Sequence, residues 1–190
     1  MKTNVRCAWS GDDTRMVHYH DTEWGVPVHD DTLLFEFLIL EGAQAGLSWK
    51  TVLHKRDTYR KAFKKFNPRA VAAFKEQDFE RLLKNPGIIR NRLKVRGATK
   101  NAKAFITIQK EFGSFDTYIW KFVGDKPLVH RIKNSQEIPI TTNESDAMSK
   151  DLKKRGFTFV GSTICYAFMQ AVGMANDHET RCFRYQSLAS

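Results

Sequence analysis

The spacing of apolar residues constrains the fold of this chain more than any other feature of its sequence. Aliphatic and aromatic side chains recur at intervals of three and four positions, as in WKTVLHKRDTYRKAFKKF at residues 49–66. That period places apolar residues on one face of an α-helix. Runs that alternate between polar and apolar residues, which indicate β-strands, are scarce. The sequence therefore predicts an all-α fold.

Capping residues and helix breakers divide this pattern into segments. Ser48, Asp78 and Ser114 are typical N-caps, Pro68 suits a first helical turn, and Gly42 is a typical stop. The segment 124–143 has few helix signals and is predicted to be an irregular crossover. The predicted helices are residues 30–42, 49–66, a short helix from 68, 79–84, 90–112, 115–123, 145–156, 163–173 and a turn at 176–182.

No repeat, low-complexity segment or linker divides the chain, so we expect one domain spanning residues 1–190. A chain of this length buries enough surface to form a core without disulfides. No apolar run reaches the roughly 18 residues that a membrane helix needs. The first residues also lack the apolar region of a signal peptide. These features lead us to expect a cytoplasmic protein.

Positive charge is the main departure from an ordinary composition. The chain has 31 Lys and Arg residues against 21 Asp and Glu residues, a formal net charge of +10. Such an excess favours polyanionic partners, with nucleic acid ahead of a membrane surface. The alternative is a soluble protein that is basic without such a partner.

Cysteine and histidine residues form two pairs near opposite ends of the chain. Twelve residues separate Cys7 from His20, and three separate His178 from Cys182. Cysteine and histidine are zinc ligands, and four of them complete a closed, structural tetrahedral site. The odd cysteine count argues against a disulfide scaffold, and Cys165 lies in an apolar run typical of a core.

A metal bound by these two pairs would clamp the N-terminus to the C-terminal part of the chain. The spacing HxxxC predicts that the second pair shares one helix face. The alternative is a buried Cys182, an exposed Cys7 and two ordinary histidines. The other histidines lack a ligand-spaced partner and are expected to be surface or capping residues: His18, His29, His54 and His130.

The stretch LLKNPGIIRNRLK, residues 82–94, predicts a helix-hairpin-helix around residues 79–95. A short helix is followed by a tight turn with Gly87 and by the start of a basic helix. Amide groups at such a helix start can bind a phosphate. Arg90, Arg92 and Lys94 add positive charge there. The alternative is a plain turn between two helices with solvated basic side chains.

Glu41 ends an almost wholly apolar run, LLFEFLILEG. If its carboxylate faces the interior, it needs a partner, whereas a solvated carboxylate is unusual at a helix C-terminus. Four aromatic residues among the first 49 could stack on a nucleobase: Trp9, Tyr19, Trp24 and Trp49. Together they predict a pocket for a flat ring. The aromatic faces of such a pocket bind a cationic ring more strongly than a neutral one.

Six segments carry a resemblance to a known family. They are CAW, YHDTEWGVP, LEGAQAGLSW, PGIIRNR, SDAMSKDLKKRGFTFVGSTICYAFMQAVG and NDHETRC. With them, nearly the whole chain resembles the 3-methyladenine DNA glycosylase I family, the constitutive bacterial type in the helix-hairpin-helix glycosylase superfamily. The resemblance implies a DNA repair enzyme that flips out 3-methyladenine and hydrolyses its N-glycosidic bond.

The resemblance also implies a fold, a cofactor and site residues. The implied fold is all-α, with one structural zinc ion joining the terminal segments and no organic cofactor. The implied zinc ligands are Cys7, His20, His178 and Cys182. The implied base pocket has Glu41 as its catalytic residue and Tyr19, Trp49, Trp9 and Trp24 as base-binding residues. The implied DNA-binding residues are Gly46 and Leu47, which fill the gap left by the flipped nucleotide, and Gly87, Ile88, Arg90 and Arg92.

The resemblance has further implications for partner and location. The expected partner is double-stranded DNA containing alkylated adenine, bound by a monomer in the bacterial cytosol and associated with the nucleoid through its function. Asn91 stands where bifunctional superfamily members place a lysine, and 109–111 supply no aspartate where many members have one. We therefore expect no lyase activity. Met16 replaces an aromatic residue that the family can carry, and Ile89 replaces a second hairpin glycine.

Two alternative functions remain open at this level. A non-catalytic helix-hairpin-helix protein that senses damage would explain the charge and the hairpin, although it leaves Glu41 and the aromatic residues without a use. A glycosylase that acts on another alkylated or mismatched base would use all of these features. Products released from alkylated DNA distinguish the three possibilities.

Overall fold

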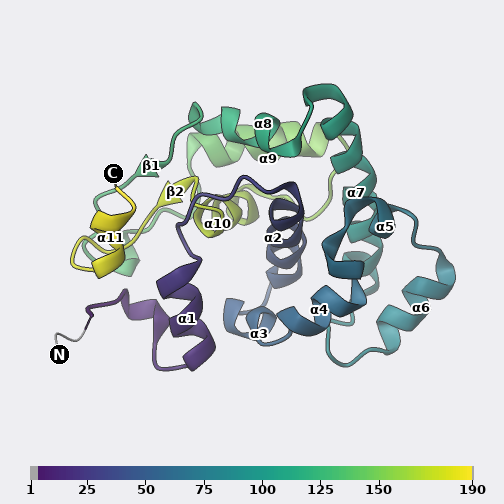
Figure 1. Cartoon of the computed structure of the whole chain (residues 1–190), viewed down its shortest axis with the longest axis horizontal. Helices are drawn as coiled ribbons and strands as arrows, with labels where there is room; N and C mark the ends of the chain where they lie inside the picture. Colours follow the sequence, from purple (N-terminus) through teal and green to yellow (C-terminus); the bar gives the residue numbers. More distant parts are fainter. Residues whose placement is uncertain (1–3, 190) are drawn as a thin grey trace.

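The computed structural model describes residues 4–189, so the outermost residues of the predicted domain at 1–190 lie outside it. The prediction of an all-α fold is confirmed, since the elements are almost all helical (Figure 1). The α-helices are α1 Thr14–Thr22, α2 Asp31–Gln44, α3 Trp49–Leu53, α4 Arg56–Ala62, α5 Pro68–Ala72, α6 Glu76–Lys84, α7 Arg92–Phe112, α8 Phe115–Ile119, α9 Asn143–Lys154, α10 Ser162–Ala171 and α11 Phe183–Ser187.

Short elements complete the fold. The 3₁₀ helices are η1 Ala8–Ser10, η2 Lys64–Phe66, η3 Trp120–Val123 and η4 Ser135–Glu137, and the strands are β1 Leu128–Val129 and β2 Ala175–Asn176. The two strands pair in parallel, with Leu128 opposite Ala175. Within residues 4–189, no helix combines the length and the hydropathy that crossing a bilayer requires.

Helix α2 forms the centre of the molecule. Every residue from Leu34 to Ala43 is buried, which is typical of a helix that is apolar on all sides. Helices α7, α8 and α10 pack against it, and Figure 1 shows α2 between α10 on one side and α4 and α7 on the other. Because α2 is surrounded, any polar side chain on it must face either a partner or a cavity.

Two predicted helix boundaries are wrong for reasons of packing. Helix α2 continues through Gly42 to Gln44, because Gly42 serves close packing: a Cβ there would lie 3.3 Å from the Phe159 Cβ. The predicted helix at 49–66 is broken into α3, α4 and η2. Its last turn is left-handed, with φ angles of 54°, 53° and 55° at Lys64, Lys65 and Phe66.

Helix α6 also begins earlier than predicted. Its N-cap is Lys75, and Asp78 lies in the first turn, where its carboxylate accepts a hydrogen bond from the Lys75 amide at 3.1 Å. Asp78 therefore acts as the acidic partner of a capping box. The other predicted caps, Ser48 and Ser114, accept hydrogen bonds from Thr51 and Thr117 amides, as expected.

The two ends of the chain lie side by side. The Phe183 amide donates to the Val5 carbonyl at 3.0 Å, and Figure 1 shows the first and last elements at one end of the molecule. The predicted helical turn at 176–182 is wrong. This segment contains the end of β2 and a non-helical turn, and Cys182 is the N-cap of α11.

Candidate binding pocket and metal cluster

A cavity of about 370 Å³ lies among the N-terminal helices, α2, α10 and the crossover segment. All five residues predicted to form a pocket line it, so the structure brings them together. The full lining is Trp9, Tyr19, Trp24, Glu41, Gln44, Trp49, Ser135, Ile138, Ala167 and Gln170. A concave site with mostly apolar walls and a few polar groups is typical of a small-molecule site.

Glu41 is the acidic residue of this cavity. It is only 3% exposed, and its Oε2 atom has no hydrogen-bond partner among the described residues. Burial raises its pKa from 4.5 to about 8. A buried carboxyl group without a protein partner in a cavity marks a functional site, because a ligand can supply the missing donor.

The aromatic residues form two walls of the cavity. The ring centroids of Trp9 and Trp24 are 4.8 Å apart with an interplanar angle of 71°, and those of Tyr19 and Trp49 are 5.2 Å apart. The indole nitrogens of Trp9 and Trp49 are buried and have no partner among the residues described. Burial and the Glu41 carboxylate raise the pKa of the Tyr19 hydroxyl. These walls suit a flat aromatic ligand.

The sequence did not identify half of the cavity lining. Gln44, Ser135 and Ile138 lie at a helix end or in the crossover segment, and Ala167 and Gln170 lie on α10. Residues of these types are common on protein surfaces and in helices, so their presence in a sequence does not indicate a binding site. Met16 is buried in the core and is not among the lining residues, so it does not replace an aromatic wall.

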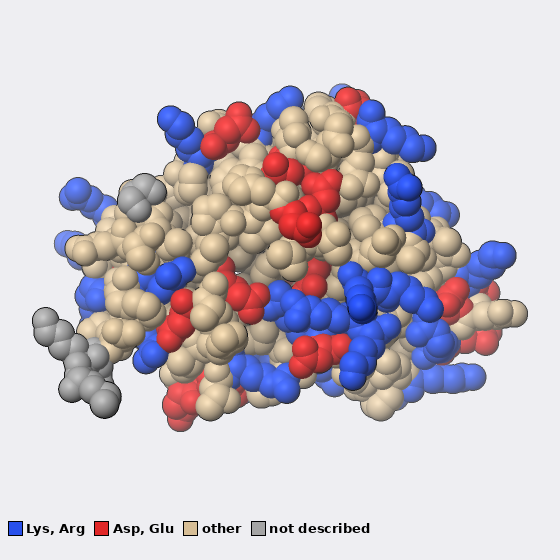
Figure 2. Space-filling model, viewed as in Figure 1, with Lys and Arg blue, Asp and Glu red and all other residues tan. Residues whose placement is uncertain are grey.

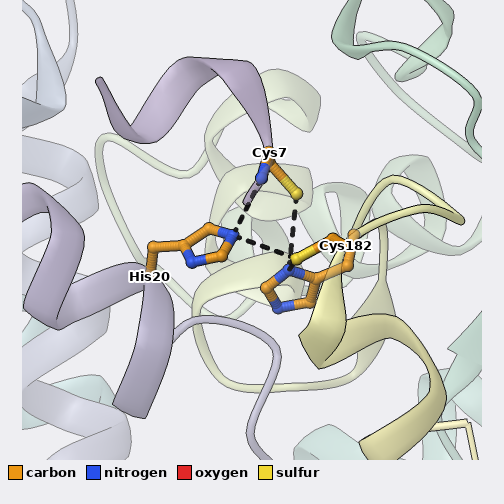
Figure 3. A group of neighbouring side chains, drawn as sticks. Cys7, His20 and Cys182 are labelled. Carbon is orange, nitrogen blue, oxygen red and sulfur yellow. Dashed lines mark hydrogen bonds between the residues drawn. The ribbon is translucent and has the colours of Figure 1, made fainter. Parts of the chain in front are cut away.

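Cys7, His20, His178 and Cys182 form one buried cluster. Their candidate ligand atoms all lie within 4.8 Å of one another, and Figure 3 shows three of these side chains pointing toward one another. The Cys7 Sγ to His178 Nδ1 and Cys182 Sγ to His20 Nε2 distances are both 3.5 Å. Tetrahedral zinc with ordinary bond lengths places a sulfur and a nitrogen ligand about 3.6 Å apart. The donor set and its geometry therefore fit a tetrahedral metal ion.

The second nitrogen of each imidazole ring has its own acceptor. His20 Nδ1 lies 2.8 Å from Asp21 Oδ1, and His178 Nε2 lies 3.0 Å from the Trp24 carbonyl oxygen. Since each of these nitrogens donates a proton, His20 Nε2 and His178 Nδ1 carry the lone pairs that a metal would bind, and that of His20 accepts a long hydrogen bond, 3.3 Å, from the Cys7 amide. Acceptors placed in this way orient metal ligands.

The cluster reaches this geometry without the predicted shared helix face. His178 and Cys182 lie on a turn, where their Nδ1 and Sγ atoms are 3.6 Å apart. The hydrogen bond with Cys7 and the nearby imidazoles lower the pKa of Cys182, whereas that hydrogen bond and burial raise the pKa of Cys7. Even without a metal, the cluster therefore favours one thiolate, the form that binds metals.

The cluster and the cavity share a wall. The ring centroids of Trp24 and His178 are 4.6 Å apart, and those of Trp9 and His20 are 5.3 Å apart. Both tryptophans line the cavity. A metal in the cluster would hold these indoles in place, and it would not reach a ligand through an open position because all four ligands come from the chain.

Segment 85–91 joins α6 to α7 and contains Gly87. A Cβ at Gly87 would lie 2.3 Å from the Thr58 Cγ2, so α4 alone requires glycine there. The Gly87 amide donates to the Asn85 side chain at 2.8 Å, and the Ile89 amide donates to the Tyr59 hydroxyl at 3.0 Å. The Ile88 and Asn91 amides also donate, to the Asn85 and Ile89 carbonyls, so most amides of this segment are already bound within the protein.

The remaining predicted DNA-binding residues differ in accessibility. Arg90 and Arg92 are exposed beside the start of α7, and Gly46 and Leu47 are exposed between α2 and α3. Ile88 is buried, so only its main chain could contact a ligand. Lysine and arginine side chains also gather over α4 and η2 on the face shown in Figure 2. A hollow on this surface is lined by Arg60, Lys61, Lys64 and Lys65 together with acidic residues.

Comparison with known proteins agrees with this geometry. Residues 9–185 match the family model for methyladenine glycosylase. The chain is 50% identical to DNA-3-methyladenine glycosylase 1 of Escherichia coli over 95% of this chain and 96% of that protein. It is 46% identical to DNA-3-methyladenine glycosylase of Haemophilus influenzae over 94% of this chain and 96% of that protein.

Solved structures give the same result. A crystal structure of a 3-methyladenine DNA glycosylase I superposes with a TM-score of 0.92 at 50% identity, covering 94% of this chain and 98% of that one. A structure of 3-methyladenine DNA glycosylase I from Staphylococcus aureus, described as the basis of 3-methyladenine recognition, superposes with a TM-score of 0.92 at 34% identity. It covers 95% of this chain and 96% of that one.

Proposed function

The chain belongs to the methyladenine glycosylase family, and from this membership we propose that it removes 3-methyladenine from alkylated DNA by hydrolysing the N-glycosidic bond. The observation that carries the proposal is the unpartnered Glu41 carboxyl group in a cavity with aromatic walls. An alkylated adenine supplies both a flat ring for those walls and amine hydrogens for the carboxylate.

The reaction requires little help from an acid. A base stacked in a duplex must first be flipped into the cavity. N3-methylated adenine is cationic in DNA, so the electron pair of the breaking bond leaves with the base and makes it neutral. Water then forms the new bond to the sugar carbon and releases a proton to solvent. This chemistry accounts for a site without the aspartate of other superfamily members.

Glu41 acts on the base in this proposal. A cationic base beside the carboxyl group lowers its pKa from about 8 and so favours the ionised form, which accepts hydrogen bonds from the base and attracts its positive charge in a pocket of low dielectric. The same charge stabilises a developing positive charge on the sugar. Trp49 and Tyr19 stack on the base, while Trp9 and Trp24 complete the walls. Normal adenine carries no charge and has a stronger glycosidic bond, so it is not released.

The DNA-binding surface in this proposal consists of the turn after α2 and segment 85–91 with the start of α7. Gly46, at φ 78°, turns the chain after α2, and Leu47 beside it is 43% exposed. An exposed leucine at such a turn suits insertion between bases of a double strand. The helix-hairpin-helix of α6 and α7, with Gly87, Ile88, Arg90 and Arg92, would hold the backbone of the same DNA. Lyase activity is not expected.

We also propose that the four-residue cluster holds one zinc ion. The support is the Cys₂His₂ donor set, its near-tetrahedral spacing and the acceptors that orient both imidazoles. Zinc supplies structural cross-linking at such a site.

We propose that the protein acts as a monomer, since one chain supplies the whole cavity and cluster. We also propose that it acts in the bacterial cytosol, where the nucleoid DNA is accessible.

Release of free 3-methyladenine from methylated duplex DNA, measured by chromatography, tests the function. We expect release by the parental protein and a roughly 10- to 100-fold loss in Glu41→Gln, the effect of losing a hydrogen bond to a charged group. Glu111→Gln is the control, because Glu111 is exposed and pairs with Arg155 instead. DNA binding without release of any base supports the damage-sensing alternative, and release of a different base supports the other glycosylase.

A further inference from the structure

Asp177 is a fully buried carboxylate beside the cavity. It accepts hydrogen bonds from the Tyr166 hydroxyl at 2.5 Å, from Gln170 Nε2 at 2.7 Å and from His130 Nδ1 at 2.6 Å. Tyr166 and Gln170 lie on α10, whereas His130 directly follows β1. His130, which the sequence predicts to be a surface or capping residue, is half-buried and bound to Asp177. The network ties the crossover segment to one wall of the cavity.

The contact with Asp177 fixes the orientation of the Gln170 amide. An ionised carboxylate only accepts hydrogen bonds, so the amide nitrogen of Gln170 faces Asp177. The amide oxygen of Gln170, bonded to the same carbon, therefore points away from Asp177. It accepts no hydrogen bond from residues 4–189, and Gln170 lines the same cavity as Glu41.

We propose that Gln170 is a specificity-determining residue whose amide oxygen accepts a hydrogen bond from the exocyclic amine of the bound base. This inference rests on the proposed function. Adenine bases present an amine at position six, whereas guanine-type and hypoxanthine-type bases present an oxygen acceptor there. If the Gln170 amide cannot rotate, its oxygen repels an acceptor at that position of the base. Asp177 is the positioning residue, since it prevents the amide from rotating to offer its nitrogen.

A fixed amide differs from a free one in its power to discriminate. A freely rotating glutamine donates to one base and accepts from another, so it tolerates both. The Gln170 amide would have to abandon a 2.7 Å hydrogen bond to a buried carboxylate in order to rotate. Rotation would replace this hydrogen bond to a charged group by a contact between the amide oxygen and a carboxylate oxygen, which is repulsive. The selectivity of the cavity therefore depends on Asp177, although Asp177 does not line the cavity.

Binding of free bases to the full chain tests this proposal. The probes are 3-methyladenine and 3-methylhypoxanthine, and the readout is quenching of the cavity tryptophans. In Gln170→Met, which keeps the length of the side chain and removes both polar atoms, we expect the preference for 3-methyladenine to fall roughly 3- to 10-fold. In Asp177→Asn, whose amide can donate to Gln170, rotation becomes possible and we expect the preference to fall as well.

Tyr166→Phe is the matched control. It removes another hydrogen bond to Asp177, but Tyr166 does not line the cavity. We expect it to lower the melting temperature without changing the preference between the two bases. A purely structural network predicts instead that the preference stays at the parental value in every variant, which would overturn the proposal.

The variants can be judged even if one fails to fold. Metal content and the melting curve identify such a variant, and the remaining one of Gln170→Met and Asp177→Asn then decides the result. If the parental protein neither binds 3-methyladenine nor releases it from DNA, the proposed function itself fails and this inference fails with it. Parental binding with an unchanged preference in the folded variants overturns this inference alone.

Discussion

The ammonium group of Lys94 donates a hydrogen bond to the carbonyl oxygen of Ala45 at 2.7 Å, and a second to that of Ala43 at 2.8 Å. These carbonyls end α2, where a positive charge is favourable. Lys94 itself lies in the first turn of α7, directly after segment 85–91. One side chain therefore joins the segment proposed to hold the DNA backbone to the turn that carries Leu47.

Replacing Lys94 should separate DNA-dependent activity from base binding. In Lys94→Met, the end of α2 loses both hydrogen bonds, so the turn with Leu47 is less well placed for insertion. We expect kcat/KM on methylated duplex DNA to fall roughly 10-fold, the effect of about 1.4 kcal/mol, while the affinity for free 3-methyladenine stays unchanged. Lys100→Met, at an exposed position of α7, should change neither quantity.

Glu41 should give the protein a measurable dependence of stability on pH. Its pKa is about 8 in the folded protein and near 4.5 when exposed. Between these values the folded state keeps a proton that the unfolded state releases, so stability falls as pH rises. The contribution is about 1.4 kcal/mol per pH unit and ends above the folded pKa.

Urea unfolding of the parental protein and of Glu41→Gln from pH 5 to pH 9 measures this contribution. The difference in unfolding free energy between the two proteins should change steadily with pH up to about 8 and then level off. Other titrating groups cancel in the difference. A difference that does not vary with pH would mean that the Glu41 carboxyl group is solvated.

Removal of one cluster ligand should cost the metal and much of the stability. In Cys182→Ser, we expect zinc content to fall from one ion per chain to near zero and the melting temperature to fall by roughly 5–15 °C, as for a loss of a few kcal/mol. Mass spectrometry under native conditions and calorimetry measure the two quantities. Cys165→Ser is the control, since Cys165 is buried outside the cluster. Equal melting of metal-free and metal-loaded protein would contradict a clamp.

Gly87 should be required by its contact with α4. In Gly87→Ala, the new Cβ meets Thr58 Cγ2 at 2.3 Å, so we expect a loss of about 1–3 kcal/mol in the free energy of unfolding. Thr58→Ser removes that methyl group and should restore part of the loss in the double variant. If glycine is needed there only for close approach of a phosphate, Gly87→Ala will leave the free energy of unfolding unchanged.

The helical architecture was predictable because its signals are local. Ser48, Pro68 and Ser114 act within one turn of the chain, so their roles follow from neighbouring residues. The left-handed turn at 64–66 was not predictable, because its sequence is ordinary and the conformation depends on tertiary packing. The continuation of α2 past Gly42 has the same origin, since Gly42 packs tightly against Phe159 from another segment.

The site was predictable to the extent that its residues are chemically unusual. Glu41 within an apolar run and cysteines near histidines draw attention in any sequence. Gln170 and Asp177 do not, because an amide or carboxylate on its own does not reveal what it faces. Their relation depends on the packing of β2 against the end of α10, which only the folded chain defines.

The distance along the chain between Cys7 and His178, which is 171 positions, sets the order in which the pocket can be completed during synthesis. A growing chain makes Glu41 and the four aromatic residues of the pocket long before the turn that holds the last two cluster ligands has left the ribosome. Contacts of such long range form late. An interrupted product would carry the acidic residue and the aromatic walls without His178 and Cys182 beside them. Completion of the pocket and its supporting cluster therefore depends on synthesis of nearly the whole chain.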